Sequence, residues 1–304
     1  MKNKLLFILS FIVFTLTLQA QPLNFCTASN AHFFNCLMNL IGCLHKHNYQ
    51  DIGEIAVFDL GLSTEQKDIL NAIQKVSIHE IDRVHPDILT PVQTTPWGKM
   101  VPGWYAWKAV LVKQALDLFD RVLYIDAGTT VYRPLNDLFD HIDYAGYFLH
   151  NGSPWCIKQE TTEYVINKFG LNHANKQWLL DESVKGLEAG FWGVTRRVYD
   201  TFAMPLYELA HDLNNFADDG TCRGGFGNCR HDIPMFSMIA LLNGFTIYHH
   251  YQNPRQDLQL LTSKGPITFH IACNPQDRTP NTHVYCSRMD VSQLQQNVQA
   301  IHWK

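Results

Sequence analysis

Blocks of apolar and polar residues alternate along the first half of the chain, and they predict strands that are followed by helices. Residues 22–28 form a mostly apolar run of strand length. Within residues 32–47, apolar side chains recur at the spacing of one helix face, at Phe33, Leu37, Leu40, Ile41 and Leu44. Residues 54–60 predict a second buried strand. Ser63, with Gln66 three residues later, predicts a helix that begins with a capping box.

The same alternation continues up to Asp126. Residues 75–82 predict a third strand, and residues 104–119 predict a helix. Residues 85–103 are rich in proline and threonine and have no regular pattern, so we expect a loop long enough to be functional. The apolar run Val122–Ile125 predicts a buried strand that ends at Asp126. Continuous apolar strands between helices are typical of a parallel sheet covered on both faces, so the predicted fold class is α/β.

Beyond Asp126 the predicted elements are less regular. Helical patterns cover residues 159–185, 196–216 and 232–245. Strand-like runs cover residues 144–150, 186–195, 245–250 and 265–273. A length of 304 residues is common for an α/β enzyme with one domain, so we expect residues 21–304 to form a single domain.

The N-terminus has the pattern of a secretory signal peptide. Lys2 and Lys4 precede the uncharged and mostly apolar segment Leu5–Leu18, and the small residue Ala20 follows at a plausible cleavage position. The segment is short for a membrane span, and an uncleaved signal anchor is the alternative. Residues 1–20 therefore predict the secretory pathway: a secreted or periplasmic protein, or one in the lumen of the endoplasmic reticulum or Golgi. Contact with a membrane is expected only if the segment is an anchor.

All eight cysteines lie beyond the signal segment, and an even number in an exported chain suggests disulfides. The strongest local candidate is Cys222 with Cys229, because the intervening residues are rich in glycine. Cys273 with Cys286 is a second candidate. Cys36 and Cys43 share one face of a predicted helix, but their separation of roughly 10 Å along its axis is too great for a bridge between them.

Charge excludes one class of partner. The chain has 24 basic and 28 acidic residues and a formal net charge of −4, with 46% hydrophobic residues to build a core. A nucleic-acid-binding protein usually carries a basic stripe, so no nucleic-acid partner is expected.

Asp126 is the first candidate for chemistry. It follows a buried strand, and ligands of open parallel sheets bind outside the carboxyl ends of the strands. A lone aspartate at a strand end more often caps a turn, so its position alone is a weak signal. The residues after it, Ala127 and Gly128, supply no second carboxylate.

Several segments together resemble GT-A glycosyltransferases, enzymes that use nucleotide-diphospho-sugars. The resemblance covers most of residues 22–272, and its segments are FCTASNAHFFNCLMNLIGCL, EIAVFDLGLSTEQKDIL, WYAWKAVLVKQAL, RVLYIDAGTTVYRPL, GLEAGFWGV and RHDIPMFSMIALLNG. The resemblance implies a Rossmann-type, mixed but mainly parallel sheet flanked by helices. It also implies transfer of a sugar from a nucleotide-diphosphate donor to a hydroxyl of a glycan or protein.

The resemblance also implies a donor site. In that family, an Asp-x-Asp motif binds Mn²⁺ or Mg²⁺ and the donor ribose, because a divalent cation neutralises the charge that develops on the leaving diphosphate. Here only Asp126 matches, and Gly128 stands where the second acid is expected. Two alternatives stay open. Either Asp126 holds a metal together with His270 and the donor phosphates, or the site uses no metal and basic groups such as Lys108, at the start of a helix, neutralise the phosphates.

On the acceptor side, the resemblance implies that Glu188 and Asp232 hold or deprotonate the acceptor hydroxyl. Asp232 equally fits the N-cap of a helix. Trp104 and Trp107 are expected to pack in the core rather than stack on a ligand. Two other functions are alternatives: a hydrolase, which needs two carboxylates across one glycosidic bond, and a non-catalytic protein that binds a carbohydrate or a partner.

Overall fold

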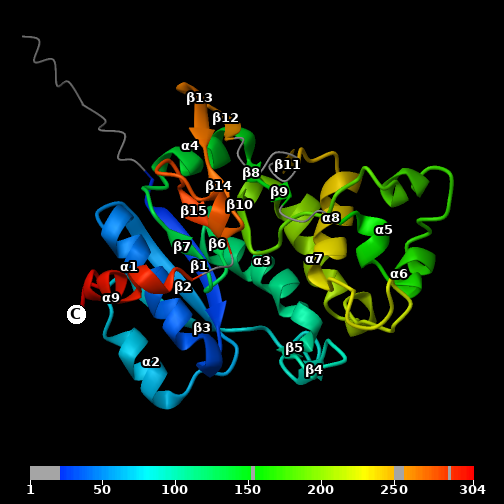
Figure 1. The fold of residues 1–304 in the computed structure, drawn as a ribbon, viewed down its shortest axis with the longest axis horizontal. Helices are drawn as coiled ribbons and strands as arrows, with labels where there is room; N and C mark the ends of the chain where they lie inside the picture. The colour runs from blue at the N-terminus through cyan, green and yellow to red at the C-terminus, as the bar shows by residue number, and fades with distance from the viewer. Residues whose placement is uncertain (1–20, 152–154, 250–256, 287–288) are drawn as a thin grey trace, which may run out of the picture.

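A six-stranded sheet forms the centre of the molecule in the computed structural model, which describes residues 21–151, 155–249, 257–286 and 289–304 (Figure 1). The predicted signal segment lies outside these residues. β1 pairs in parallel with β2 and β6, and β2 with β3, whereas β10 runs antiparallel to both of its neighbours. The mainly parallel α/β sheet is thus confirmed. Its order is β3 (Val76–Glu80), β2 (Ile52–Asp59), β1 (Leu23–Ser29), β6 (Arg121–Ile125), β10 (Phe191–Thr195) and β8 (Tyr147–Phe148).

Helices cover both faces of this sheet, because the strands bury side chains on both sides. Along β6, Val122 and Tyr124 belong to one hydrophobic cluster, while Leu123 and Ile125 belong to the other. The first cluster contains α3 (Trp107–Leu118), α7 (Met204–Leu209) and α8 (Asp232–Leu242), and the second contains α1 (Phe34–Asn48), α2 (Thr64–Asn71) and α4 (Asn136–Ala145). The C-terminal α9 (Leu294–Gln299) packs on α1 (Figure 1).

The capping box predicted for the second helix is confirmed. Ser63 Oγ accepts the N–H of Gln66 at 3.3 Å, and the Gln66 side chain accepts the N–H of Ser63 at 3.0 Å. Asp59, at the end of β2, accepts the N–H groups of Gly61 and Leu62 and pairs with Lys67, so it closes the turn between strand and helix.

Predictions for the middle of the chain were partly wrong. Residues 159–185 do not form one helix, because short helices alternate with turns there, and Gly170 adopts a left-handed φ of +60°. These elements are α5 (Ile157–Glu160), α6 (Glu163–Lys168) and η3 (Gln177–Leu180). The segment 85–103 is also not fully irregular. It contains a small hairpin of β4 (Pro91–Gln93) and β5 (Met100–Pro102).

The strand expected at residues 265–273 is two strands that separate at His270. β13 (Gly265–Phe269) forms a hairpin with β12 (Leu258–Thr262), which projects at the top of Figure 1. β14 (Ile271–Ala272) joins a separate three-stranded sheet with β15 (Val284–Tyr285) and β7 (Thr130–Val131). β9 (His150–Asn151) pairs with β11 (Tyr248–His249). The remaining helical turns are η1 (Ala31–Phe33), η2 (Gly103–Tyr105), η4 (Arg196–Val198), η5 (Tyr199–Ala203), η6 (Leu213–Asn215), η7 (Pro275–Asp277) and η8 (Val291–Gln293).

Within the part of the chain that the structure describes, none of the helices has the length and apolar character needed to cross a bilayer.

Candidate active site

A polar cleft of about 760 Å³ opens beyond the carboxyl end of β6. Its walls come from the β4–β5 hairpin, the start of α3, the segment before β10, the start of α8 and the residues that follow β14 and β15. It contains three cationic and three acidic side chains. The lining residues are Thr94, Thr95, Trp97, Lys99, Tyr105, Lys108, Asp126, Glu188, Ala189, Gly227, Cys229, Arg230, His231, Asp232, Ile233, Cys273, Asn274 and Cys286.

The buried ammonium of Lys108 joins two of the predicted carboxylates. Its Nζ lies 3.1 Å from Asp126 Oδ1 and 3.4 Å from Asp232 Oδ2, and it also donates to the carbonyl oxygen of Ala189. The Lys108 side chain is only 7% exposed. Burial disfavours its charged form, but the negative charges of Asp126 and Asp232 outweigh this cost and raise the pKa of Lys108. Lys108 is therefore a permanent cation at the base of the cleft.

Glu188 lies in the same electrostatic cluster. Its Oε1 accepts the N–H of Gly190 at 3.0 Å. Burial raises the pKa of Glu188, and the Asp126 charge adds to this rise while the Lys108 charge opposes it. The structure thus brings together four residues singled out from the sequence: Lys108, Asp126, Glu188 and Asp232.

Two hydrogen bonds fix Asp126, one to its carboxylate and one from its backbone. The Tyr124 hydroxyl donates to Asp126 Oδ1 at 2.5 Å, and the N–H of Asp126 donates to the carbonyl of Gly190. Burial and the adjacent Asp126 raise the pKa of Tyr124, so its hydroxyl stays protonated as a donor. Asp126 therefore has a fixed orientation toward Lys108.

Asp232 is the first residue of α8, and the N-cap is His231, so the predicted N-cap position was off by one residue. His231 adopts a left-handed φ of +51° and places its ring Nδ1 2.9 Å from the carbonyl of Phe216. Burial lowers the pKa of His231. As a first-turn residue, Asp232 still gains from the positive end of the helix dipole.

A left-handed segment directly before α3 aims Tyr105 into the cleft. Gly103, Trp104 and Tyr105 have φ values of +46°, +53° and +62°. A Cβ on Gly103 would lie 2.0 Å from the carbonyl oxygen of Ile88, so only glycine fits there. Such backbone strain in non-glycine residues concentrates at functional sites. The Tyr105 ring lies 5.6 Å from Lys108 Nζ, and burial raises the pKa of Tyr105 to about 12.

Two cations at the rim were missed by sequence reasoning, Lys99 and Arg230. Lys99 is exposed on the β4–β5 hairpin and forms no ion pair among the described residues; its nearest aromatic contact is the Tyr105 ring. Arg230 is half-exposed, and its Nε lies 3.7 Å from the buried Glu160. Arg230 begins the segment RHDIPMFSMIALLNG, but nothing in the sequence shows that this segment and the loop of Lys99 meet in the folded chain.

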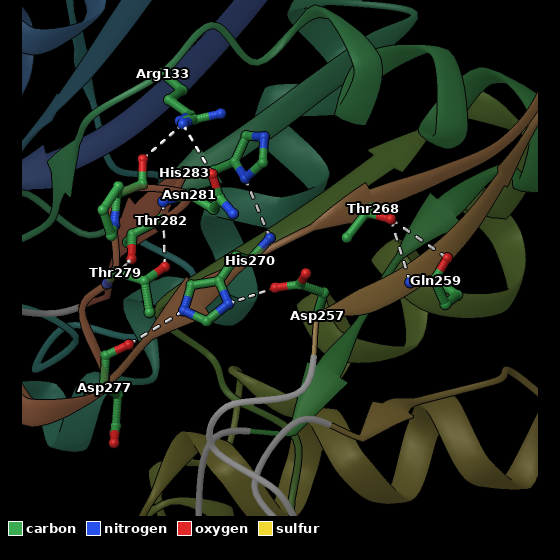
Figure 2. Close-up of polar contacts among 11 residues, drawn as sticks. Arg133, Asp257, Gln259, Thr268, His270, Asp277, Thr279, Asn281, Thr282 and His283 are labelled. Atoms are coloured by element: carbon green, nitrogen blue, oxygen red, sulfur yellow. Dashed lines mark hydrogen bonds and ion pairs between the residues drawn. The ribbon is translucent and has the colours of Figure 1, made fainter.

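His270 is not among the residues that line the cleft. Its Nδ1 is 2.6 Å from Asp257 Oδ1, and its Nε2 is 3.2 Å from the carbonyl oxygen of Asp277 (Figure 2). Both ring nitrogens thus have protein partners. His270 also packs next to His283, whose Nδ1 accepts the backbone N–H of His270. The structure does not bring His270 and Asp126 together in the cleft.

Gly128 and Trp107, two other residues considered from the sequence, do not line the cleft. Gly128 lies in the turn that the N–H of Thr129 closes on the carbonyl of Asp126, and it does not line the cleft. Trp107 is buried in the core, as expected, and Trp104 packs against the same cluster.

The carboxylates of the cleft do not form a metal site in this arrangement. Among residues 21–151, 155–249, 257–286 and 289–304, no group of three or more His, Cys, Asp or Glu side chains is placed to hold a metal ion. The position between Asp126 and Asp232 is taken by the Lys108 ammonium, a cation of the protein itself. This donor set does not fit a divalent ion.

Comparisons with known proteins bear on the fold. No family model and no curated protein matches the sequence. Among solved structures, the chain is similar to an active-site mutant of LgtC at 13% identity and a TM-score of 0.51, covering 92% of this chain and 96% of LgtC. LgtC is a galactosyltransferase with a structure in complex with donor and acceptor sugar analogues.

Two further similarities are weaker. Mouse xyloside xylosyltransferase 1 matches at 11% identity and a TM-score of 0.44, with 75% of this chain and 84% of that one covered. Core-mannan synthase A from Aspergillus fumigatus, in its Mn/GDP form, matches at 10% identity and a TM-score of 0.46, with 79% and 74% covered. The similarity to LgtC over nearly the whole length shows that this chain has the fold of GT-A glycosyltransferases.

Proposed function

We propose that this protein is a glycosyltransferase that moves a sugar from a nucleoside-diphosphate donor to a hydroxyl acceptor. The observation that carries the proposal is the charge cluster of Lys108, Asp126, Glu188 and Asp232 in a cleft at the carboxyl end of β6. In a doubly wound sheet this edge is where ligands bind. The GT-A fold supports the same reaction class.

We further propose that the donor diphosphate binds without a divalent ion at Asp126. Lys108 supplies the positive charge next to Asp126, although two carboxylates already balance it. Further positive charge at the rim comes from Lys99 and Arg230, which lie on two different loops that line the cleft. Ammonium and guanidinium groups are the protein's own means of neutralising phosphate oxygens. Lys99 and Arg230 are therefore the proposed phosphate contacts.

Replacement of Lys99 or of Arg230 by alanine is expected to weaken the binding of UDP or GDP by about tenfold each, because each change removes one charge-assisted contact. Isothermal titration calorimetry of the full-length protein measures the effect. Lys264→Ala is the matched control, since Lys264 is an exposed lysine in the turn of the β12–β13 hairpin and does not line the cleft. Equal affinity in all three variants would contradict the assignment of these cations.

The acceptor base is proposed to be Glu188. A general base works best when its pKa lies near the operating pH, and burial moves the pKa of Glu188 in that direction. Asp232, in contrast, pairs with Lys108, so its proposed role is to position Lys108 and to accept a hydrogen bond from the acceptor hydroxyl. A direct test of the reaction class is release of UDP or GDP from a panel of nucleotide sugars. A folded protein that binds nucleotides and turns over no donor would favour the non-catalytic alternative.

The secretory pathway remains the proposed location. A disulfide is expected in such an oxidising compartment, so the cysteine pairs bear on this proposal. Cys273 and Cys286 directly follow the paired residues Ala272 and Tyr285 of β14 and β15. The Cys286 thiol contacts Cys273, and burial together with this contact raises the pKa of Cys286. Cys222 and Cys229, in contrast, donate to the carbonyls of Gly225 and Glu160. The geometry therefore favours the second predicted pair over the first.

We expect a disulfide between Cys273 and Cys286 in protein exposed to glutathione disulfide, which takes up two electrons as the two thiols lose two protons. Peptide mapping after alkylation, without reduction, would detect the linked peptides. Reduction should lower the melting temperature of the oxidised wild-type protein and of the Cys222→Ser variant. It should leave the melting temperature of Cys273→Ser unchanged. Alkylation of both thiols after such oxidation would contradict this pairing.

A further inference from the structure

A second cavity adjoins the cleft, and most of its lining residues lie outside the donor site proposed above. It measures about 450 Å³ and lies between the start of α5 and the glycine-rich loop before α8. Gly227 and Arg230 line both this cavity and the cleft, so the two spaces are continuous. Its other lining residues are Trp155, Gln159, Glu160, Arg223, Gly224 and Asn228.

The cavity presents an exposed indole among planar polar groups. Trp155 is 53% exposed, although large aromatic side chains usually gain by burial. Around it lie the amides of Gln159 and Asn228 and two guanidinium groups. A sugar ring has an apolar C–H face that suits an indole, and hydroxyls at its edge that suit amides and guanidinium groups. Ligand sites typically combine such an aromatic wall with a few polar groups.

Arg223, the arginine that lines this cavity and not the cleft, is charge-balanced, which favours a neutral ligand at this end. Arg223 Nη1 lies 3.0 Å from Glu182, and Arg230 Nε lies 3.7 Å from Glu160. Each guanidinium has five N–H donors, so hydrogen-bonding capacity remains after these contacts. Away from Arg230, which it shares with the cleft, the cavity offers an acidic or phosphorylated ligand no uncompensated charge.

The walls of the cavity are held in place before any ligand arrives. The buried Asp218 accepts the N–H groups of Gly220 at 2.9 Å and Gly227 at 2.7 Å, which fixes the glycine-rich loop. A Cβ on Gly227 would lie 2.6 Å from Pro96 Cδ, so this loop packs closely against the β4–β5 hairpin. On the opposite wall, the N–H of Gly186 donates to the carbonyl of Trp155. A preformed cavity binds with a smaller ordering cost.

We propose that this cavity binds a neutral sugar unit of the acceptor, stacked on Trp155, one unit away from the hydroxyl that is glycosylated in the cleft. The inference rests on the proposed function and names its acceptor class: a neutral glycan of two or more sugar units. The bound chain runs from Glu188 and Asp232 past Arg230 and Gly227 to Trp155. A monosaccharide fills the cleft alone and leaves the second cavity empty.

The test uses an array of defined mono- and oligosaccharides, neutral and acidic, probed with the full-length protein, its Trp155→Ala variant and Trp303→Ala. Trp303 is a similarly exposed tryptophan near the C-terminus and serves as the matched control. We expect binding of neutral oligosaccharides, weakened about tenfold in Trp155→Ala and unchanged in Trp303→Ala. Thermal melting verifies that both variants are folded.

Other outcomes overturn the proposal. These are binding of acidic glycans alone, equal binding of the monosaccharide, binding that survives in Trp155→Ala, and no binding to any glycan. Calorimetry with UDP and GDP on the same three proteins separates this proposal from the proposed function. If none of the three proteins binds a nucleotide, the proposed donor site is wrong. The glycan-binding result then remains as independent evidence on the second cavity. Loss of nucleotide binding in Trp155→Ala alone would make Trp155 a base-stacking residue and contradict the proposal.

Discussion

Replacement of Lys108 by methionine is expected to lower the free energy of unfolding by about 3 kcal/mol at neutral pH. The variant keeps the length of the side chain but leaves Asp126 and Asp232 without the cation that lies 3.1 Å and 3.4 Å away. Removal of one partner from a buried ion pair leaves an uncompensated charge in a poorly solvated place, and Asp232 is the more buried of the two acids. Urea denaturation measures the change.

The pH dependence of this effect has a definite sign. The pKa of Lys108 is raised in the folded state, so its contribution to stability is complete below the ordinary lysine pKa and is lost only as the pH rises through the folded value. The wild-type protein should therefore keep this contribution across the neutral range. The Lys108→Met variant should lack this contribution throughout the same range.

Lys113→Met is the matched control for this prediction. Lys113 lies on the same helix and pairs with Asp117 at 2.7 Å, but both side chains reach solvent. Exposed pairs contribute roughly 0.2–1 kcal/mol, so the control should differ little from wild type. If Lys108→Met were as stable as Lys113→Met at neutral pH, the buried cation would not hold the cluster together.

Replacement of Glu188 by glutamine is expected to lower the rate of sugar transfer by about 100-fold or more, because it removes the proposed general base. Donor binding should persist, since the change adds no bulk. Stability at neutral pH should not fall. Burial raises the pKa of Glu188, so its ionised form destabilises the fold at a pH above that value, and glutamine removes this cost. Loss of turnover together with retained stability would distinguish a base from a structural residue.

The rate of the wild-type enzyme should depend on pH in a matching way. A general base works when deprotonated, so the acid limb of the pH–rate profile should lie above the ordinary glutamate pKa and should vanish in Glu188→Gln. Glu208→Gln, at an exposed position, is the control. An unchanged acid limb in Glu188→Gln would move the role of base to another group.

The sequence predicts the first half of the fold well because each of its elements follows a local rule. β2 contains the apolar run Ile55–Phe58, and the helix after it has a capping box whose two hydrogen bonds both form. The second half follows local rules less closely. Pairing there depends on distant partners: β13 pairs with β12, whereas β14, two residues later, pairs with β15. Periodicity along residues 265–273 cannot show that His270 separates two sheets.

Part of the site could also be predicted. Asp126 ends a strand and Lys108 begins a helix, and both positions are visible in the sequence and lie at the sheet edge where ligands bind. Their contact with each other was not predictable, since eighteen positions and a whole helix separate them. Tyr105 depends on three successive left-handed residues, for which Gly103 is the sole local signal. Lys99 and Arg230 reach the cleft only because two loops meet there.

The sequence left open whether a metal or a basic group serves the donor phosphates, and the side chains around Asp126 favour the basic group. The carboxylate that resembles the first acid of the metal-binding motif is paired with Lys108 and hydrogen-bonded to Tyr124. His270, the other proposed ligand, is engaged by Asp257 and Asp277. Lys108, a lysine paired with two acids, is a fixed cation of the protein at the base of the cleft.

The most direct test of this account is calorimetric titration of the full-length protein with UDP and with GDP, each in EDTA and in Mn²⁺. We predict that at least one nucleotide binds in EDTA, with an affinity that Mn²⁺ changes little. Binding that requires Mn²⁺ and disappears in Asp126→Ala would contradict the metal-free donor site. Absence of binding under both conditions, in protein shown to be folded, would contradict the donor site altogether.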